Sequence, residues 1–298
     1  MTKTPLISIG IPAYNAAAHI GSTLESLLAQ TFGDFELIIS DNASTDATRD
    51  IIEDYKLHDA RICYERQPVN IGANSNYSFV ARCARGQFFK WSSSSDWCGP
   101  TFLERCKDEL LAHNDAVLAV PRTRLFQNEP GISQDYEDDI EILDDQPSAR
   151  FVRLTGTLAL NNAMNGLIRT LALQRTRLID RYRQADIVLM GHLALLGKFR
   201  LLDERLFYRR MDIATATALQ DQRAVWKHHY PQLNPQTLCQ GSKRLVGWIR
   251  VALSAPMPLN ERFRTLKYVA KMCYWERRII MHDLHGVCIY FTRRTWPD

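Results

Sequence analysis

Residues 7–46 read ISIGIPAYNAAAHIGSTLESLLAQTFGDFELIISDNASTD, and this stretch decides the fold. It holds two short apolar runs, 6–11 and 35–40, separated by a segment, 20–28, whose isoleucine and leucines recur at helical spacing. Apolar residues at i, i+4 and i+7 form one face of an α-helix. A strand, a helix and a second strand at this spacing predict a β-α-β unit with two parallel strands.

The alternation of strand and helix patterns continues along the chain. Further strands are expected at 61–65, 87–92 and 115–120, and further helices at 45–55, 74–84 and 100–112, with Ser44 as the expected N-cap of the first of these helices. After an acidic segment, 134–145, which is expected to be a solvated hairpin or loop, helices are expected at 147–160, 170–183 and 185–197, a strand at 199–210, and helices after 213. The pattern predicts an α/β fold with a Rossmann-like, mostly parallel sheet flanked by helices.

The composition is that of a globular protein, with 46% apolar and 23% charged residues in 298. The seven cysteines are scattered and form no C-x-x-C pair, which favours free thiols over a zinc site. The start of the chain lacks the apolar core of a signal peptide, and no apolar run reaches about 18 residues. A cytoplasmic protein is therefore expected.

The polar, turn-forming residues gather where the predicted strands end. Pro12-Ala-Tyr-Asn follows the first strand, 41–46 follows the second, and the WSSSSDW stretch, 91–97, contains the end of the fourth. In an open parallel sheet, ligands bind beyond the carboxyl ends of the strands. A ligand site is therefore expected at this edge, although the G-x-G-x-x-G and P-loop patterns are absent.

The motif at 7–46 resembles the start of the family 2 glycosyltransferases, which are inverting nucleotide-sugar enzymes of GT-A fold. The resemblance covers the first 112 residues well and extends more weakly to 212. It implies a GT-A domain at 1–212, with a nucleotide-binding half (1–120) and an acceptor half (121–212). Residues 213–298 have no assigned counterpart and are expected to form a basic, helical C-terminal region.

The implied function is transfer of a sugar, of the hexosyltransferase type, from a nucleotide diphosphate-sugar to a hydroxyl of a glycan, lipid-linked or other cell-surface acceptor. The nucleotide-binding residues would be Pro12, Tyr14, Asn15, Asp41, Asn42, Asn74, Ser95 and Asp96. Asn42 stands where the family usually has the second aspartate of a pair, so an amide could read the base. Uridine, guanosine and thymidine donors remain open.

The resemblance also implies a divalent cation, Mn²⁺ or Mg²⁺, on the donor diphosphate. The family's Asp-x-Asp-Asp segment aligns with the four serines, so that Ser93 and Ser95 occupy places where acids are common and Asp96 remains. Serine hydroxyls are neutral and bind such cations weakly, whereas magnesium can take substrate phosphate oxygens and water molecules as ligands. Asp212 is the second candidate ligand; a helix N-cap is its alternative role.

The resemblance places a catalytic base at Asp186, where a carboxylate would take the proton of the acceptor hydroxyl. An N-cap is the alternative role for Asp186, and Asp180 is the alternative base. The acceptor-facing wall would comprise Asn162, Asn165, Gly166 and His192. The histidine lies in an apolar run, so a core position is its other reading.

The C-terminal stretch from Gly241 carries eleven Lys/Arg and four Asp/Glu, whereas the rest of the chain is slightly acidic. Either a contact with the inner face of a membrane or a homodimer interface is expected there, because aromatic and basic residues suit both. Nucleic-acid binding has no motif to support it. A rival to the enzyme is a nucleotide-sugar-binding protein that no longer catalyses; a sugar nucleotidyltransferase would need a glycine- and arginine-rich first loop, which is absent.

Overall fold

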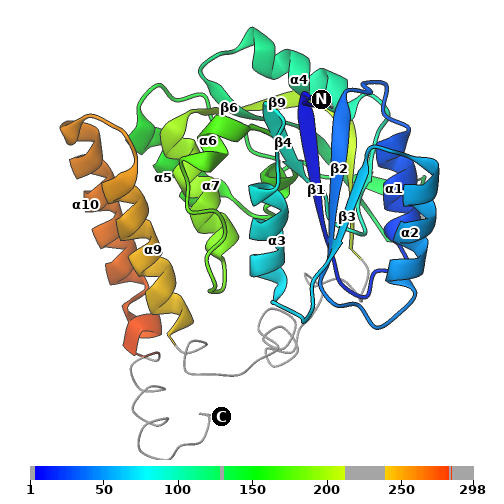
Figure 1. Ribbon diagram of the computed structural model, residues 1–298. Helices are drawn as coiled ribbons and strands as arrows, with labels where there is room; N and C mark the ends of the chain where they lie inside the picture. The colour runs from blue at the N-terminus through cyan, green and yellow to red at the C-terminus, as the bar shows by residue number, and fades with distance from the viewer. Residues whose placement is uncertain (1–3, 128–130, 212–238, 282, 284–298) are drawn as a thin grey trace, which may run out of the picture.

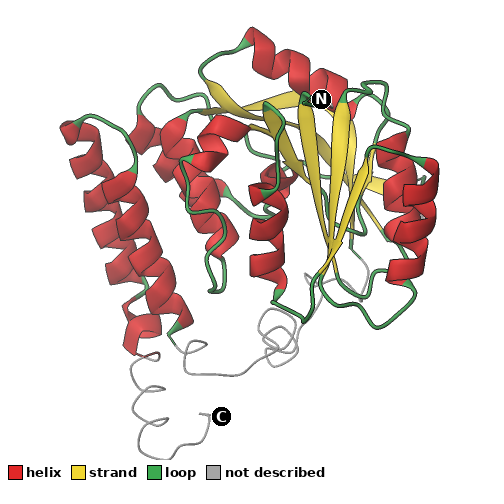
Figure 2. Cartoon of the chain, in the orientation of Figure 1, coloured by secondary structure: helices red, strands yellow, loops and turns green. Residues whose placement is uncertain are grey.

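A computed structural model describes residues 4–127, 131–211, 239–281 and 283. Its sheet consists of β1 (Ile7–Ala13), β2 (Phe35–Asp41), β3 (Ile62–Arg66), β4 (Phe88–Trp91), β5 (Trp97–Cys98), β6 (Ala116–Phe126), β7 (Ser133–Asp135), β8 (Leu167–Arg169) and β9 (Lys198–Arg210). The helices are α1 (Ile20–Leu28), α2 (Thr48–His58), α3 (Ala73–Arg82), α4 (Phe102–Ala112), α5 (Pro147–Thr157), η1 (Asn162–Asn165), α6 (Thr170–Gln174), α7 (Ala185–Leu196), α9 (Gln240–Ser254) and α10 (Leu259–Trp275). The predicted α/β class and the alternation of elements are confirmed (Figures 1 and 2).

The strand order is β3-β2-β1-β4-β8-β6-β9-β5, with β7 paired to β6. Pairs β1–β2, β2–β3, β1–β4 and β6–β9 are parallel, whereas β8 runs antiparallel to both of its neighbours. Every residue of β1 and β2 is buried, as expected for strands covered on both faces. The carboxyl ends of β1 to β4 therefore meet at one edge of the sheet.

Helices cover both faces of the sheet, and two hydrophobic clusters mark the two interfaces (Figure 1). One cluster joins the sheet to α1, α2 and α4, and the other joins it to α3, α5 and α7. Gly10 of β1 lies under α3, where an added Cβ would come within 2.7 Å of Val80 and 2.8 Å of Phe89. The absence of a side chain there lets α3 pack closely on β1.

Some local expectations differ from the structure. Helix α2 begins at Thr48 rather than at 45, because Ser44 does not cap it: its Oγ accepts the Asn15 N–H at 3.0 Å. The helix expected at 170–183 ends at Gln174, and turns follow. The acidic segment adds one short strand, β7, at the edge of β6.

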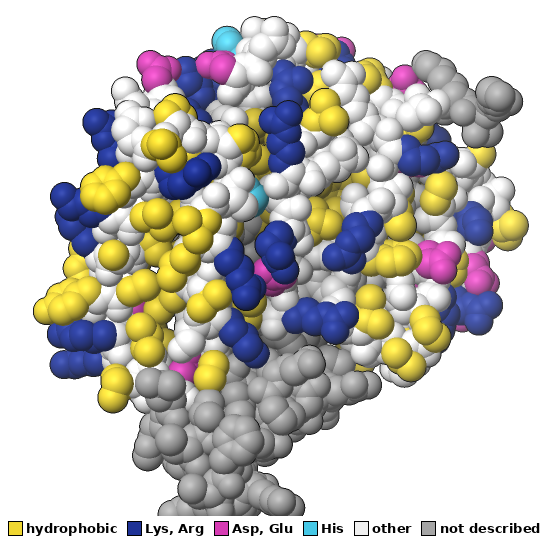
Figure 3. Space-filling view, turned by 60° about the vertical axis from the view of Figure 1, so that its left-hand side comes forward, with side chains coloured by type: hydrophobic (Ala, Val, Ile, Leu, Met, Phe, Trp, Pro, Cys, Tyr) yellow, Lys and Arg dark blue, Asp and Glu magenta, His cyan; other side chains and the backbone are white. Residues whose placement is uncertain are grey.

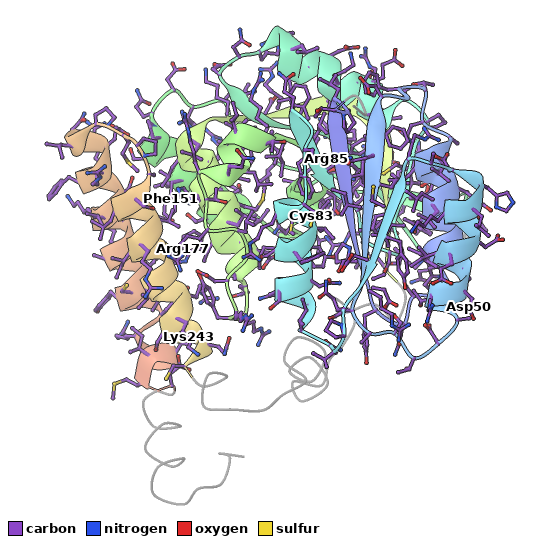
Figure 4. All side chains as sticks on the ribbon, viewed as in Figure 1. Asp50, Cys83, Arg85, Phe151, Arg177 and Lys243 are labelled. Atoms are coloured by element: carbon purple, nitrogen blue, oxygen red, sulfur yellow. The ribbon has the colours of Figure 1, made fainter. Side chains whose placement is uncertain are left out.

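The two C-terminal helices pack on α5 and α7 as an outer layer (Figure 1). Trp248 of α9 is 2% exposed, and its ring centroid lies 5.2 Å from that of Phe151 in α5, which is labelled in Figure 4. The predicted helical character of the C-terminal region holds for α9 and α10. The predicted boundary at 212/213 falls outside the described residues. No helix in the described ranges has the length and apolar character needed to cross a bilayer.

Candidate functional site

The first two strand-end loops are tied to each other by hydrogen bonds. Pro12 is buried at the end of β1, and Tyr14 follows it with 37% of its surface exposed. The Asn15 side-chain oxygen accepts the Thr45 N–H at 2.9 Å, and Asn15 has a positive φ of 47°, a conformation that asparagine tolerates. These bonds fix the 12–15 loop against the 41–46 loop and bring the predicted nucleoside residues together.

Asp41 is fully buried at the end of β2, and both of its carboxylate oxygens have partners. Oδ1 accepts the Ser44 N–H at 2.8 Å, and Oδ2 accepts the Tyr64 hydroxyl at 3.1 Å and lies 3.5 Å from Arg66 Nη1. Burial and the Asp41 charge raise the pKa of Tyr64 to about 12, so this hydroxyl keeps its proton as a donor. Arg66 thus places a positive charge at this edge of the sheet, and the sequence pattern did not predict this residue.

Asn42 shapes the loop that leads into α3. Its Oδ1 accepts the Ile71 N–H at 2.8 Å, and its Nδ2 donates to Asn70 Oδ1 at 2.8 Å. Asn70 Oδ1 also accepts the Gly72 N–H, and Gly72 has a φ of 83°. Because Asn42 is 2% exposed and its amide makes these bonds, its side chain stabilises the 70–72 loop. A contact between Asn42 and the nucleotide base stays a prediction.

Asn74, in the first turn of α3, links the two halves of the domain. Its Nδ2 donates to the carbonyl oxygens of Asp180 and Tyr182, both at 2.9 Å. The alternative base Asp180 lies on that same segment, and its carboxylate is 3.6 Å from Arg177 Nε. This link holds the segment before α7 against α3 and so helps to position the next candidate residues.

The four serines form an ordered turn at the end of β4. The Ser92 N–H bonds to Gly10 O at 2.9 Å, and the hydroxyl oxygens of Ser93 and Ser95 lie 3.2 Å apart. The Asp96 carbonyl accepts the Thr23 hydroxyl at 2.9 Å. The stretch is therefore fixed to β1 and α1 rather than behaving as a linker.

Asp96 is 7% exposed, and its Oδ1 accepts the backbone N–H of Arg210 at 2.9 Å. Burial raises the pKa of this carboxyl, while that hydrogen bond and the nearby charges of Arg209, Lys90 and Arg210 act to lower it. The short strand β5, which follows Asp96 directly, pairs antiparallel with β9, and this pairing brings the arginines to the serine turn.

Lys90 of β4 is a site residue that the sequence reading missed, although a lysine within the apolar run FFKW signals it. It is completely buried, and its ammonium donates to Trp91 O at 2.9 Å and Asn165 O at 2.8 Å. The same nitrogen lies 4.5 Å from the centroid of the Phe102 ring. Lys90 thus joins the strand end before the serine turn to the predicted acceptor wall.

Asn162 and Gly166 form the predicted acceptor wall with Asn165. Asn162 Oδ1 accepts from Arg209 Nη1 at 2.7 Å, and its Nδ2 donates to Asp139 Oδ1 at 3.0 Å. A Cβ on Gly166 would come within 2.7 Å of Ala119 O, so the backbone lies tightly on β6. The wall is therefore a fixed surface.

Asp186 lies in the first turn of α7, half-buried, and does not cap the helix. The residue at the N-cap is Gln184, and no side chain bonds to the free amides there, so the alternative N-cap role is wrong. Instead, Asp186 Oδ2 accepts the side-chain amide of Asn161 at 2.9 Å. The favourable end of the helix dipole and this bond hold a carboxylate beside the acceptor wall.

Tyr77 of α3 reveals that the candidate groups share one region. Burial raises its pKa to about 12, and the charges of Asp96, Arg209 and Asp186 all act on it. The hydrogen bonds Asp186–Asn161, Asn162–Arg209 and Arg210–Asp96 join the same groups through residues that are neighbours in the chain. No pattern in the sequence indicates Tyr77.

His192 lies elsewhere, at the junction of α7 and α9. It is 3% exposed, its Nε2 has no hydrogen-bond partner, and burial lowers its pKa to about 4. It lines a small cavity with Tyr182, Gly247 and Arg250. This placement matches the core reading of the histidine, and an acceptor contact by His192 stays a prediction.

The described residues fit a divalent cation poorly. Asp212 lies outside them, and within them no group of three or more His, Cys, Asp or Glu side chains could hold a metal ion. At the serine turn, Asp96 is the carboxylate present, one of its oxygens already accepts an amide, and cationic side chains surround it. Hard divalent cations prefer several anionic oxygen ligands, which this donor set does not offer.

The family model described as Glycosyl transferase family 2 matches residues 8–183. Chondroitin synthase from Escherichia coli is 36% identical over 109 residues, which make up 37% of this chain and 16% of that protein. The matched part of the chain thus spans well under half the length of such curated relatives.

Solved structures show the same fold. S. aureus TarS 1–349, in complex with UDP-GlcNAc, has a TM-score of 0.64 at 15% identity, with 90% of this chain and 72% of that chain covered. The mannosyltransferase PcManGT from Pyrobaculum calidifontis, in complex with GDP-Man and Mn²⁺, has a TM-score of 0.54 at 14% identity, with 98% and 82% covered.

Proposed function

This chain belongs to glycosyl transferase family 2, and on that premise we propose that it is an inverting glycosyltransferase. It would move a sugar from a nucleotide diphosphate-sugar to a hydroxyl of a glycan, lipid-linked or other cell-surface acceptor. The observation that carries the proposal is the series of hydrogen bonds that connects Asp186, through the adjacent Asn161 and Asn162, to Arg209, whose neighbour Arg210 bonds to Asp96.

The chemistry follows from these positions. The Asp186 carboxylate takes the proton of the acceptor hydroxyl while that oxygen bonds to the anomeric carbon of the sugar. The bond between the anomeric carbon and the diphosphate oxygen breaks, and its electron pair leaves with the diphosphate. Attack from the face opposite to the leaving group inverts the anomeric configuration. Asn161 orients the carboxylate for this step through its 2.9 Å bond.

The donor would bind at the carboxyl edge, with its nucleoside between Tyr14 and the 70–72 loop and its diphosphate near Ser95 and Asp96. The tied loops provide a site that needs little reorganisation. The donor base remains open among uridine, guanosine and thymidine. The Mn²⁺ or Mg²⁺ implied by the resemblance stays a prediction, and no step above passes through a metal.

The C-terminal helices favour one of the two expected partners. The outer face of α10 and the helical turn after it, residues 277–281, exposes 70% of Phe263, 65% of Tyr274 and 66% of Met281. Between these lie exposed basic residues, namely Lys267, Lys271, Arg277 and Arg278. Figure 3 shows this side of the molecule, where hydrophobic and basic side chains are mixed.

The acidic residues of this segment do not lie on that face. Glu261 is buried and accepts the Ser148 hydroxyl at 2.6 Å, and Glu276 pairs with Arg244 at 2.5 Å. A face with exposed positive charge repels a second copy of itself, whereas an anionic bilayer attracts its charges and accepts its aromatic side chains. We therefore place an anionic lipid surface, rather than a second copy of the chain, against the α10 outer face.

A donor panel tests the enzyme. The protein is incubated with UDP-, GDP- and dTDP-sugars and a bacterial envelope extract as acceptor, and release of the nucleoside diphosphate is measured. Release from one donor, which depends on the extract and is lost in Asp186→Asn, is expected. Tight binding of a donor with no release under any condition would instead establish the binding protein that no longer catalyses.

A further inference from the structure

Three basic residues act on the serine turn. Lys90, Arg209 and Arg210 all act electrostatically on Asp96, and the Arg210 N–H bonds directly to its carboxylate at 2.9 Å. The neighbouring hydroxyls of Ser93 and Ser95 are neutral. Among the described residues, three cationic side chains thus act on the one carboxylate of the serine turn. Such a set of charges repels a free divalent cation and attracts a diphosphate.

Two of the three cations are held behind the turn by backbone carbonyls. The Arg210 Nε donates to Ser95 O at 3.2 Å and its Nη1 to Gln127 O at 2.5 Å, and its guanidinium lies 4.6 Å from the centroid of the Phe126 ring. Arg210 is 7% exposed, and Lys90 is fully buried on Trp91 O and Asn165 O. Arg210 and Lys90 therefore hold the turn in position, and their buried positive charges act on it from the protein interior.

Arg209 differs because it is half-buried and reaches across to the acceptor wall. Its Nη1 donates to Asn162 Oδ1, and Asn162 is itself fixed by Asp139, which accepts the Thr123 N–H at 2.6 Å. The guanidinium is therefore held at the predicted acceptor wall, and its charge acts on Asp96 of the serine turn. The diphosphate leaves from between these two surfaces in the proposed reaction, and a planar guanidinium suits phosphate oxygens.

We propose that Arg209 contacts and neutralises the leaving diphosphate, with Arg210 and Lys90 as fixed charges behind it, so that this site binds its nucleotide without a divalent cation. The inference rests on the proposed function, because it assumes that a donor diphosphate occupies this edge. It assigns to protein cations the charge compensation that a metal ion would otherwise supply.

Calorimetric titration of the full chain with UDP, GDP and dTDP, in EDTA and in Mn²⁺, separates the inference from the function. One of the three diphosphates should bind, with dissociation constants in the two buffers that agree within about twofold. Binding that weakens about tenfold or more in EDTA overturns the inference and leaves the glycosyltransferase proposal standing. Absence of binding for every diphosphate in both buffers overturns both.

Variants on one strand identify the cation. Arg209→Met should weaken diphosphate binding about 10- to 100-fold, as expected for loss of a charge-assisted hydrogen bond, and Arg209→Lys should restore part of it. The matched control is Arg200→Met, at the other end of β9, where the guanidinium pairs with Glu109 at 2.7 Å. Wild-type binding by Arg209→Met would overturn the assignment.

A reverse variant covers the case in which Arg209→Met fails to fold. Ser95→Asp adds a carboxylate to the turn beside Asp96, so it should weaken diphosphate binding in EDTA, and Mn²⁺ should recover that loss. The wild-type chain should show no such response to Mn²⁺. If Mn²⁺ strengthens binding equally in both proteins, the wild-type site already uses the metal and the inference is wrong.

Discussion

The side-chain amide of Asn161 donates to the carboxylate of Asp186 at 2.9 Å across the gap between η1 and α7. The bond joins the predicted acceptor wall to the predicted base, although 25 residues separate the two in sequence. It gives Asp186 a defined orientation that a solvent-facing carboxylate would lack, and it leads to the first prediction.

Asp186→Asn should reduce sugar transfer about 100-fold or more, because an amide cannot accept the acceptor proton, and general bases contribute about 10²- to 10⁴-fold. Nucleotide binding should persist, since the proposed donor site lies at the strand ends. Asp180→Asn is the matched control for the alternative base and should retain transfer. A variant pair with the opposite pattern, in transfer assays with bound nucleotide measured in parallel, would reassign the base to Asp180.

Vesicle sedimentation tests the α10 outer face. The chain should sediment with vesicles that contain phosphatidylglycerol and stay in solution with pure phosphatidylcholine, because charge attraction contributes about 1 kcal/mol per basic residue near an anionic surface. Lys267→Glu/Lys271→Glu should abolish sedimentation. Arg49→Glu/Lys56→Glu, on α2 at the opposite side of the molecule, is the control (Figure 1).

Two outcomes would count against that surface. Equal sedimentation with neutral vesicles would show that charge does not drive the contact. A monomer–dimer equilibrium in ultracentrifugation that the Lys267→Glu/Lys271→Glu variant abolishes would assign the face to a second copy of the chain.

His192 makes the stability of the fold depend on pH. Burial lowers its pKa from 6.5 to about 4, so the unfolded chain takes up a proton at a higher pH than the folded chain does. The buried neutral His192 therefore costs no stability above about pH 6.5. As the pH falls from about 6.5 towards 4, the free energy of unfolding decreases by at most about 3 kcal/mol.

Denaturant unfolding at several pH values measures this effect. His192→Leu removes the titration, so its stability should vary less between pH 6.5 and 4 than that of the wild type. His58→Gln, which replaces an exposed histidine, should keep the wild-type slope. Identical slopes for all three proteins would show that His192 does not govern the acid sensitivity.

Glycines determine how closely α9 packs on α7. An added Cβ on Gly191 would overlap the Trp248 ring, so Gly191→Ala should destabilise the fold by about 1–3 kcal/mol through overpacking. Gly156→Ala, in α5, meets no atom within 4 Å and should be neutral or stabilising by up to about 1 kcal/mol. Chemical denaturation measures the free energy of unfolding of both variants. A Gly191→Ala variant as stable as the wild type would contradict the tight packing of α9 on α7.

The secondary structure of residues 6–112 was predicted well because its signals are local. Period-2 and period-3.6 patterns and strand-end turns in 6–112 specify elements whose neighbours in the sheet follow from parallel β-α-β connections. The parallel connections also predict that the polar loops meet at one edge of the sheet.

The missed residues depend on contacts between distant segments. The antiparallel insertion of β8 brings Asn165 to Lys90, and the β5–β9 pair brings Arg209 and Arg210 to the serine turn. No local periodicity encodes such pairings, so the cations around Asp96 could not be predicted as a group. The N-cap expected at Ser44 was wrong for a similar reason, because its hydroxyl bonds to the Asn15 N–H of another loop.

The anomeric configuration of the product tests the central claim most directly. Once the donor panel has identified a substrate, proton NMR of the transferred sugar, compared with the donor, reports the stereochemistry. A single carboxylate base at Asp186 predicts a product of inverted configuration that the Asp186→Asn variant fails to form. A product that retains the donor configuration, or an Asp186→Asn variant as active as the wild type, would contradict the account.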